Sequence, residues 1–162
     1  MKLSILRIRE VPMLVMKFGG TSMGSAERMC NSAAIIRDRA RNSRVGVVVS
    51  AVSGISNMLQ DSIIRLFTEG TAESPAQAAR ELRERHDAIM TDLASAVAGF
   101  SAARVGKALD PIYTEYEQLL GASFAFGECP ETVECRILGM GERLSVPVMA
   151  EILSASGEEV RV

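Results

Sequence analysis

A lysine, two glycines and two hydroxyl side chains form the strongest chemical signal in this sequence. Residues 17–22 have the sequence KFGGTS, which supplies Lys17, Gly19, Gly20, Thr21 and Ser22. Glycines let the backbone come close to a ligand and turn successive N–H groups toward an anion. The lysine and the hydroxyl groups add donors, and a helix expected just beyond adds its positive end. Together these features suit a polyphosphate.

Lys17 decides between this interpretation and a simple turn, which is the commoner meaning of two glycines after a strand. We expect Lys17 near the end of a buried strand, where an unpaired cation is costly and therefore indicates an anionic partner. The pattern is not a Walker A loop, because the lysine precedes the glycines. It is not a Rossmann fingerprint either, because Gly19, Gly20 and Gly24 do not have the G-x-G-x-x-G spacing.

A second polar loop, residues 50–57, follows the valine-rich run at 45–49. Loops that follow the strands of a parallel sheet share its carboxyl edge, where open α/β sheets bind ligands. The three serines and the asparagine of this loop could orient a small polar substrate. The alternative is a capped helix start, with Ser53 or Ser56 as the N-cap.

A third segment, residues 139–145, has the sequence GMGERLS. Glycines beside a charged pair indicate close approach of the backbone to a ligand. Glu142 could accept the ammonium group of an amino acid. The alternative is a helix N-terminus with Glu142 at a favourable position and Arg143 in solvent.

Taken in order, these segments resemble the aspartate kinases of the amino-acid kinase family. KFGGTS at 17–22 is similar to that family's signature, VVVSAVSGISNML at 47–59 to its second motif, and GERLS at 141–145 to its third. The resemblance covers about residues 14–162. It implies the reaction in which ATP phosphorylates the β-carboxylate of L-aspartate to 4-phospho-L-aspartate, the first step of lysine, threonine and methionine biosynthesis.

The resemblance also implies which residues bind the nucleotide phosphates. Lys17 would contact the transferred phosphate, with ATP and Mg2+ as cofactors. Independently of the resemblance, three cysteines and one histidine do not predict a metal site. The phosphate site would be lined by Lys17, Gly19, Gly20, Thr21 and Ser22.

Three further positions are implied to contact the substrate. Ser50 would lie near the reacting groups, and Glu142 would bind the amino group of aspartate. Ser56 stands where the family usually has threonine, and it keeps the hydroxyl group. Two other hypotheses remain open: another small-substrate kinase of the same family, and a non-catalytic binding or assembly module.

The elements that must position these residues predict an α/β fold. We expect a three-layer α/β/α arrangement of the amino-acid kinase or carbamate kinase-like type, incomplete, with a mainly parallel sheet and a helical insertion. The continuous valine run indicates a strand covered on both faces. The expected strands are residues 14–18, 45–49 and 159–162. The expected helices are residues 25–41, 57–67, 75–98, 103–120, 131–138 and 142–154, with a linker at 69–75 and a loop at 121–130.

Domain boundaries follow from the same pattern. We interpret residues 1–13 as an extension before the domain, with Met13 as an alternative start. Residues 14–162 correspond to the N-terminal part of an amino-acid kinase domain. We expect the nucleotide-binding half and the ACT domains of that family to be absent.

Composition narrows the classes of partner. The 162 residues carry a net charge of −2, which offers no basic surplus for nucleic acid. No apolar run approaches the roughly 20 residues that span a bilayer. Three cysteines without a CxxC pair argue against a disulfide framework and favour the cytoplasm. His86, the single histidine, lies on an apolar helical stripe and is expected to be packed in the core. We expect a homo-oligomer, L-aspartate as the partner, and no membrane or nucleic-acid binding.

Overall fold

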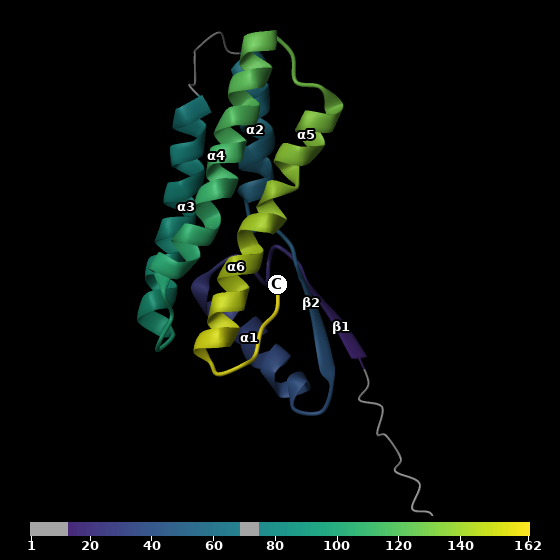
Figure 1. Cartoon of the computed structure of the whole chain (residues 1–162), viewed down its shortest axis with the longest axis vertical. Coiled ribbons are helices and arrows are strands. Elements are labelled where there is room, and N and C mark those ends of the chain that lie inside the picture. Colours follow the sequence, from purple (N-terminus) through teal and green to yellow (C-terminus); the bar gives the residue numbers. More distant parts are fainter. Residues whose placement is uncertain (1–12, 69–74) are drawn as a thin grey trace, which may run out of the picture.

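The computed structural model describes residues 13–68 and 75–162, as two parallel strands beside an assembly of helices (Figure 1). The predicted linker and the N-terminal extension fall largely on residues 69–74 and 1–12, outside the described residues. Along the chain, the elements are β1 (Met13–Phe18), α1 (Ala26–Ala40), β2 (Arg44–Val49), α2 (Ile55–Thr68), α3 (Pro75–Ala96), α4 (Ala102–Phe126), α5 (Glu131–Leu138) and α6 (Met140–Ala155).

The sheet confirms the predicted α/β class. β1 and β2 pair in parallel, from Met13 opposite Arg44 to Phe18 opposite Val49, and α1 forms the crossover between them. Both strands therefore end at the same edge, with residues 19–24 and 50–54 leaving it side by side. The predicted sharing of this carboxyl edge by the first two loops is confirmed.

Helices cover one face of this sheet in the part of the chain that the structure describes. Phe18 and Val49 are buried on the face that packs on α1 and α6. The opposite face carries Met13, Val15 and Val48, which are 64%, 66% and 47% exposed. The expectation of strands covered on both faces is thus wrong for these residues. Apolar residues in a strand favour burial, but another element must still pack on each face to bury them.

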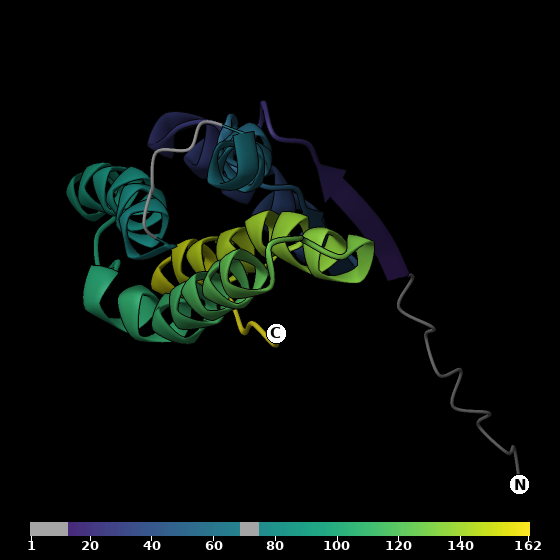
Figure 2. The ribbon, with the colours of Figure 1, turned by 90° about the horizontal axis from the view of Figure 1, so that it is seen from above.

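The helical insertion packs beside the sheet as a bundle of its own (Figures 1 and 2). α3 and α4 form an antiparallel pair, and α4 also packs on α6. The hydroxyl of Tyr116 donates to Ser62 Oγ at 2.6 Å and joins α4 to α2 inside the core. The largest fully buried apolar side chains of α2, α3 and α4 include Leu59, Leu82, Leu93, Leu109 and Leu120.

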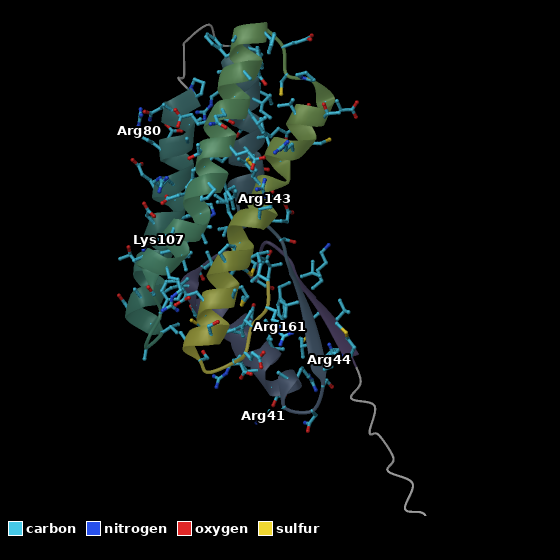
Figure 3. All side chains as sticks on the ribbon, viewed as in Figure 1. Arg41, Arg44, Arg80, Lys107, Arg143 and Arg161 are labelled. Atoms are coloured by element: carbon cyan, nitrogen blue, oxygen red, sulfur yellow. The ribbon has the colours of Figure 1, made fainter. Side chains whose placement is uncertain are left out.

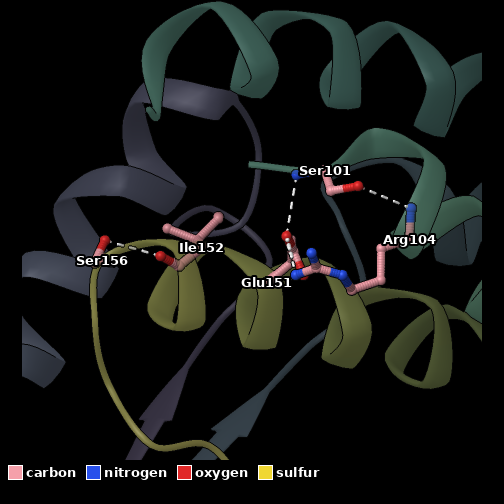
Figure 4. A network of polar contacts seen from close by, with 5 residues as sticks. All are labelled: Ser101, Arg104, Glu151, Ile152 and Ser156. Atoms are coloured by element: carbon pink, nitrogen blue, oxygen red, sulfur yellow. Dashed lines mark hydrogen bonds and ion pairs between the residues drawn. The ribbon is translucent and has the colours of Figure 1, made fainter. Parts of the chain in front are cut away.

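A buried carboxylate ties α6 to the start of α4 (Figure 4). Glu151 accepts the backbone N–H of Ser101 at 3.0 Å, and its two oxygens each lie 3.0 Å from Nη1 of Arg104. Ser101 in turn caps α4, since its hydroxyl oxygen accepts the Arg104 N–H at 3.2 Å. The bundle and the sheet-covering helix are therefore held in a fixed relation.

Two predicted boundaries are wrong. α4 continues through Gly121 to Phe126, because Leu120 and Ser123 are buried and a side chain at Gly121 would meet only the edge of Pro75. The helix ends at Gly127, whose φ of 77° lies in the left-handed region. Residues 159–162 form no strand: they lie along a hollow beside β2, without the hydrogen-bond ladder that defines one.

The remaining helices match the expected ranges to within a few residues. His86 is buried on α3 as predicted, with Nδ1 2.8 Å from the Leu82 carbonyl. Among residues 13–68 and 75–162, no helix combines the length and the apolar character that crossing a membrane requires.

Candidate functional site

The first loop is a tight turn between β1 and α1. The N–H of Ser22 donates to the Gly19 carbonyl at 2.9 Å, and that of Met23 to the Gly20 carbonyl at 3.1 Å. Met23 is fully buried and anchors the turn. By contrast, the N–H groups of Gly19, Gly20 and Thr21 donate to no backbone carbonyl in the described part of the chain. These are the donors that a phosphate requires.

Two contacts that the sequence did not indicate brace this loop from α1. Nη1 of Arg28 donates to the Thr21 carbonyl at 3.1 Å, and the hydroxyl of Ser32 lies 3.3 Å from the Ser22 carbonyl. Ser25 caps the helix, with its hydroxyl oxygen accepting the Arg28 N–H at 3.3 Å. The spacing of Ser25 and Arg28 was the available signal, since an N-cap places the third residue of the helix beside the preceding loop.

Lys17 is exposed, and the prediction that it lies on a buried strand is wrong. Its side chain lies on the same sheet face as those of Val15 and Met13, the face that no described helix covers. An exposed lysine is solvated, so its location does not by itself require an anionic partner. What remains is position: Lys17 stands two residues before Gly19, at the strand end from which the donor loop leaves.

The second loop is fastened to the first. The N–H of Ser50 donates to the Phe18 carbonyl at 2.9 Å, which extends the parallel pairing by one residue. The chain then turns through Gly54, whose φ is 87° and whose carbonyl accepts the N–H of Met58 at 3.0 Å. Gly54 thus occupies the cap position of α2, and Ser56 lies exposed in the first turn. Neither serine proposed as the N-cap holds that position.

The third segment starts α6. Gly141 is buried and Glu142 is exposed in the first turn. Arg143, placed in solvent by the alternative interpretation, is exposed and also pairs with Glu115 of α4, with Nη1 and Oε2 2.9 Å apart. Ser145 is buried, and its hydroxyl donates back to the Gly141 carbonyl at 3.2 Å.

Glycines interlock the three segments. A Cβ built on Gly20 would lie 3.2 Å from the Ala51 carbonyl oxygen, and one on Gly24 would lie 3.2 Å from Ser53 Cβ. A Cβ on Gly141 would lie only 2.6 Å from Ala51 Cβ. The second loop therefore packs between the first loop and α6. The contact at Gly141 leaves no room for a Cβ, and those at Gly20 and Gly24 are tighter than ordinary contacts. The structure brings together all the segments that carry the candidate site residues.

The donor set suits an anion and an amino acid better than a protein-bound metal. One cation lies at the end of β1, open N–H groups and hydroxyls lie on the first loop, and the Glu142 carboxylate lies on the facing helix. Among the described residues no group of three or more His, Cys, Asp or Glu side chains gathers to hold a metal ion. Cys30, Cys129 and Cys135 are free thiols.

A family profile and several known proteins match this chain in sequence. A sequence profile of the amino acid kinase family matches residues 12–161. Over 150 residues the chain is 23% identical to a bifunctional aspartokinase/homoserine dehydrogenase of Buchnera aphidicola, covering 93% of this chain and 18% of that protein. Over 143 residues it is 29% identical to an aspartokinase of Chlamydia muridarum, covering 88% of this chain and 28% of that protein.

Solved structures give the same fold. The chain superimposes on E. coli aspartokinase III in complex with aspartate and ADP, in the R-state, with a TM-score of 0.69 and 25% identity. That match covers 90% of this chain and 29% of the other. The same enzyme in complex with lysine and aspartate, in the T-state, gives a TM-score of 0.58 at 25% identity, covering 91% and 30%. The chain thus spans less than a third of the length of each of these proteins.

Proposed function

The chain belongs to the amino acid kinase family, and we propose from this premise that it provides the aspartate- and phosphate-binding part of an aspartate kinase. The observation that carries the proposal is the glycine-lined convergence of residues 19–24, residues 50–54 and the start of α6. The aspartokinases among the relatives, and the aspartate in the related crystal structures, favour aspartate over other small substrates.

The physical difficulty of this reaction is repulsion between anions. The aspartate β-carboxyl, with an ordinary pKa of about 3.9, is already ionised near neutrality, so no general base is needed. Each pair of unit charges about 4 Å apart costs roughly 4 kcal/mol at an effective dielectric of about 20. Catalysis therefore depends on cations and oriented donors around the transferred group.

The end of β1 and the first loop fit that requirement. Lys17 supplies a cation, the N–H groups of Gly19 and Gly20 supply fixed dipoles, and the hydroxyls of Thr21 and Ser22 supply further donors. The ATP that these residues would hold supplies the transferable phosphoryl group when it is bound. Mg2+ normally accompanies nucleotide phosphates, and it would be held by them, since among the described residues no three His, Cys, Asp or Glu side chains gather to bind a metal ion.

Residues of the second loop and α6 fit the amino acid. The Glu142 carboxylate would pair with the ammonium group, and the exposed hydroxyl of Ser56 would donate to a substrate carboxylate. Ser50, fixed by its N–H bond to Phe18, would present its hydroxyl beside the reacting groups. We place the activity in the cytoplasm, at the entry to lysine, threonine and methionine biosynthesis.

Self-association is part of the proposal. The uncovered sheet face exposes Met13, Val15 and Val48, and apolar surface of this kind favours an interface. Sedimentation velocity on the purified chain tests it: we expect a dimer or larger species, and a monomer across the micromolar range would contradict it.

Formation of aspartyl phosphate tests the catalytic proposal. The chain is incubated with ATP, Mg2+ and L-aspartate, the acyl phosphate is trapped with hydroxylamine, and aspartate binding is measured in parallel by calorimetry. Lys17→Ala is compared with Lys107→Ala, which removes an exposed lysine on α4 (Figure 3). We expect aspartate binding in all three proteins, with any trapped product abolished by Lys17→Ala alone. Binding of L-glutamate in preference to L-aspartate would favour another kinase of the family, and binding of neither would contradict the proposal.

A further inference from the structure

The turn of helix that carries Glu142 has no cap of its own. α5 ends at Leu138 and α6 begins at Met140, so that Gly139 ends one helix and starts the next, and none of the described side chains caps α6. The N–H of Arg143 reaches the Gly139 carbonyl only at 3.4 Å. Because the first N–H groups of a helix lack intrahelical partners, an uncapped start frays readily. The position of Glu142 must therefore be fixed from outside the helix.

The carboxylate of Glu115, on α4, forms hydrogen bonds with residues on both sides of this junction. Oε1 of Glu115 accepts a hydrogen bond from Nε of Arg136, in the last turn of α5. Oε2 of the same residue pairs with Nη1 of Arg143, in the first turn of α6, at 2.9 Å. The side chain of Glu115 is 20% exposed, whereas those of Arg136 and Arg143 are 62% and 49% exposed, so both pairs lie at the surface with the carboxylate as their more buried partner. Figure 3 shows Arg143 on α6 where that helix passes α4.

The Glu115 carboxylate is negatively charged at neutral pH, which strengthens these two contacts. Partial burial alone would raise the pKa of Glu115, but the hydrogen bonds from Arg136 and Arg143 outweigh it and hold the pKa below its ordinary value of 4.5. The carboxylate is therefore ionised and accepts two charge-assisted hydrogen bonds, which are roughly twice as strong as neutral ones.

We propose that Glu115 is a positioning residue of the candidate site: by holding Arg136 and Arg143 it fixes the first turn of α6, and with it Glu142, against the loop that begins at Ser50. Gly141 lies in the same turn and packs on Ala51 without room for a Cβ, so a small rotation of this turn displaces Glu142 and the loop together. The link to ligand binding rests on the proposed function, through the role of Glu142, whereas the link to the helix start does not.

Amide hydrogen exchange on the unliganded chain tests the structural part. Glu115→Gln removes the charge of the side chain and keeps its size. Asp110→Asn is the control, because Asp110 lies on the same helix but away from the junction, where its Oδ1 lies 2.6 Å from Nη1 of Arg83. Residues 143–146 carry the first N–H groups that a helix starting at Met140 can bond internally. We expect exchange there to accelerate on the order of tenfold in Glu115→Gln, and to change less than about twofold in Asp110→Asn.

Calorimetric titration with L-aspartate tests the functional part. We expect the Kd to rise on the order of tenfold in Glu115→Gln, the loss typical of a charge-assisted hydrogen bond. Arg143→Lys, which keeps the cation, should lose less affinity than Arg143→Met. A general loss of stability would not distinguish these two variants.

The outcomes separate this inference from the proposed function. Unchanged exchange at residues 143–146 in Glu115→Gln would overturn the inference, whatever happens to aspartate. Faster exchange with an unchanged Kd would overturn the positioning role. A wild-type chain that binds no aspartate would contradict the proposed function, and exchange alone would then decide whether Glu115 fixes the turn.

Discussion

The contact between Gly141 and Ala51 makes the sharpest prediction about how the site is assembled. In Gly141→Ala the new Cβ would lie 2.6 Å from Ala51 Cβ, where ordinary contact begins at 3.4 Å, and close to Ile55 and Leu59 as well. α6 and the second loop must therefore separate by nearly an ångström. Since Ala51, Ile55 and Leu59 are buried, the strain cannot be relieved into solvent.

Two opposing terms set the size of the effect. Alanine in place of glycine inside a helix normally stabilises by about 0.5–1 kcal/mol. Overpacking of a well-filled core costs about 1–3 kcal/mol. Because Gly141 meets both conditions, we expect a net loss of about 1–2 kcal/mol in the free energy of unfolding, together with weaker aspartate binding.

Urea denaturation followed by circular dichroism measures this change. Gly106→Ala is the matched control, because Gly106 also lies inside a helix but nothing stands within 4 Å of its Cβ position. That variant should be stabilised by about 0.5–1 kcal/mol. Adding Ala51→Gly to Gly141→Ala should recover part of the loss, and a double-mutant cycle isolates this coupling. If Gly141→Ala gained stability as Gly106→Ala does, the close packing of the two segments would be refuted.

Three further perturbations test the surrounding structure. Burial lowers the pKa of His86 below its ordinary value of 6.5, and the Leu82 carbonyl beside Nδ1 only partly offsets this. The unfolded chain therefore takes up a proton before the folded chain does, so the melting temperature should fall as pH drops below about 6.5 and level off below the folded pKa, and His86→Gln should flatten that slope. Glu151→Ala leaves the Ser101 N–H without its acceptor and should lower the free energy of unfolding by about 2–3 kcal/mol in urea titrations, whereas an unchanged midpoint would show that the network contributes nothing. Tyr116→Phe removes a buried hydrogen bond to Ser62 and should cost about 1 kcal/mol in the same assay, and a stabilised variant would contradict this expectation.

The sequence predicted the elements whose residues act locally. The valine run became β2, and the three glycine-bearing segments meet at one edge, because turn chemistry and parallel pairing depend on nearby residues. Helix ends were less predictable where packing decided them. Gly121 suggested a loop, but the buried residues on either side keep α4 helical.

Contacts between elements that are distant in the sequence could not be predicted from the sequence pattern. Lys17 lies on an exposed sheet face, since cover for a strand comes from elements that the strand's own residues do not encode. Glu115 and Arg143 are far apart in the sequence, and no spacing rule links α4 to the start of α6. Both residues look like ordinary helix-surface charges until the helices are placed side by side.

Amide chemical shifts of the isotope-labelled chain during titration with L-aspartate test the central claim most directly. If the converging segments form an amino-acid site, the largest shifts should fall on Ser50, Ser56 and the first turn of α6 at Glu142, and Glu142→Gln should remove them while Asp110→Asn leaves them intact. Shifts concentrated on α3 and α4, or the same shifts in Glu142→Gln, would contradict the account.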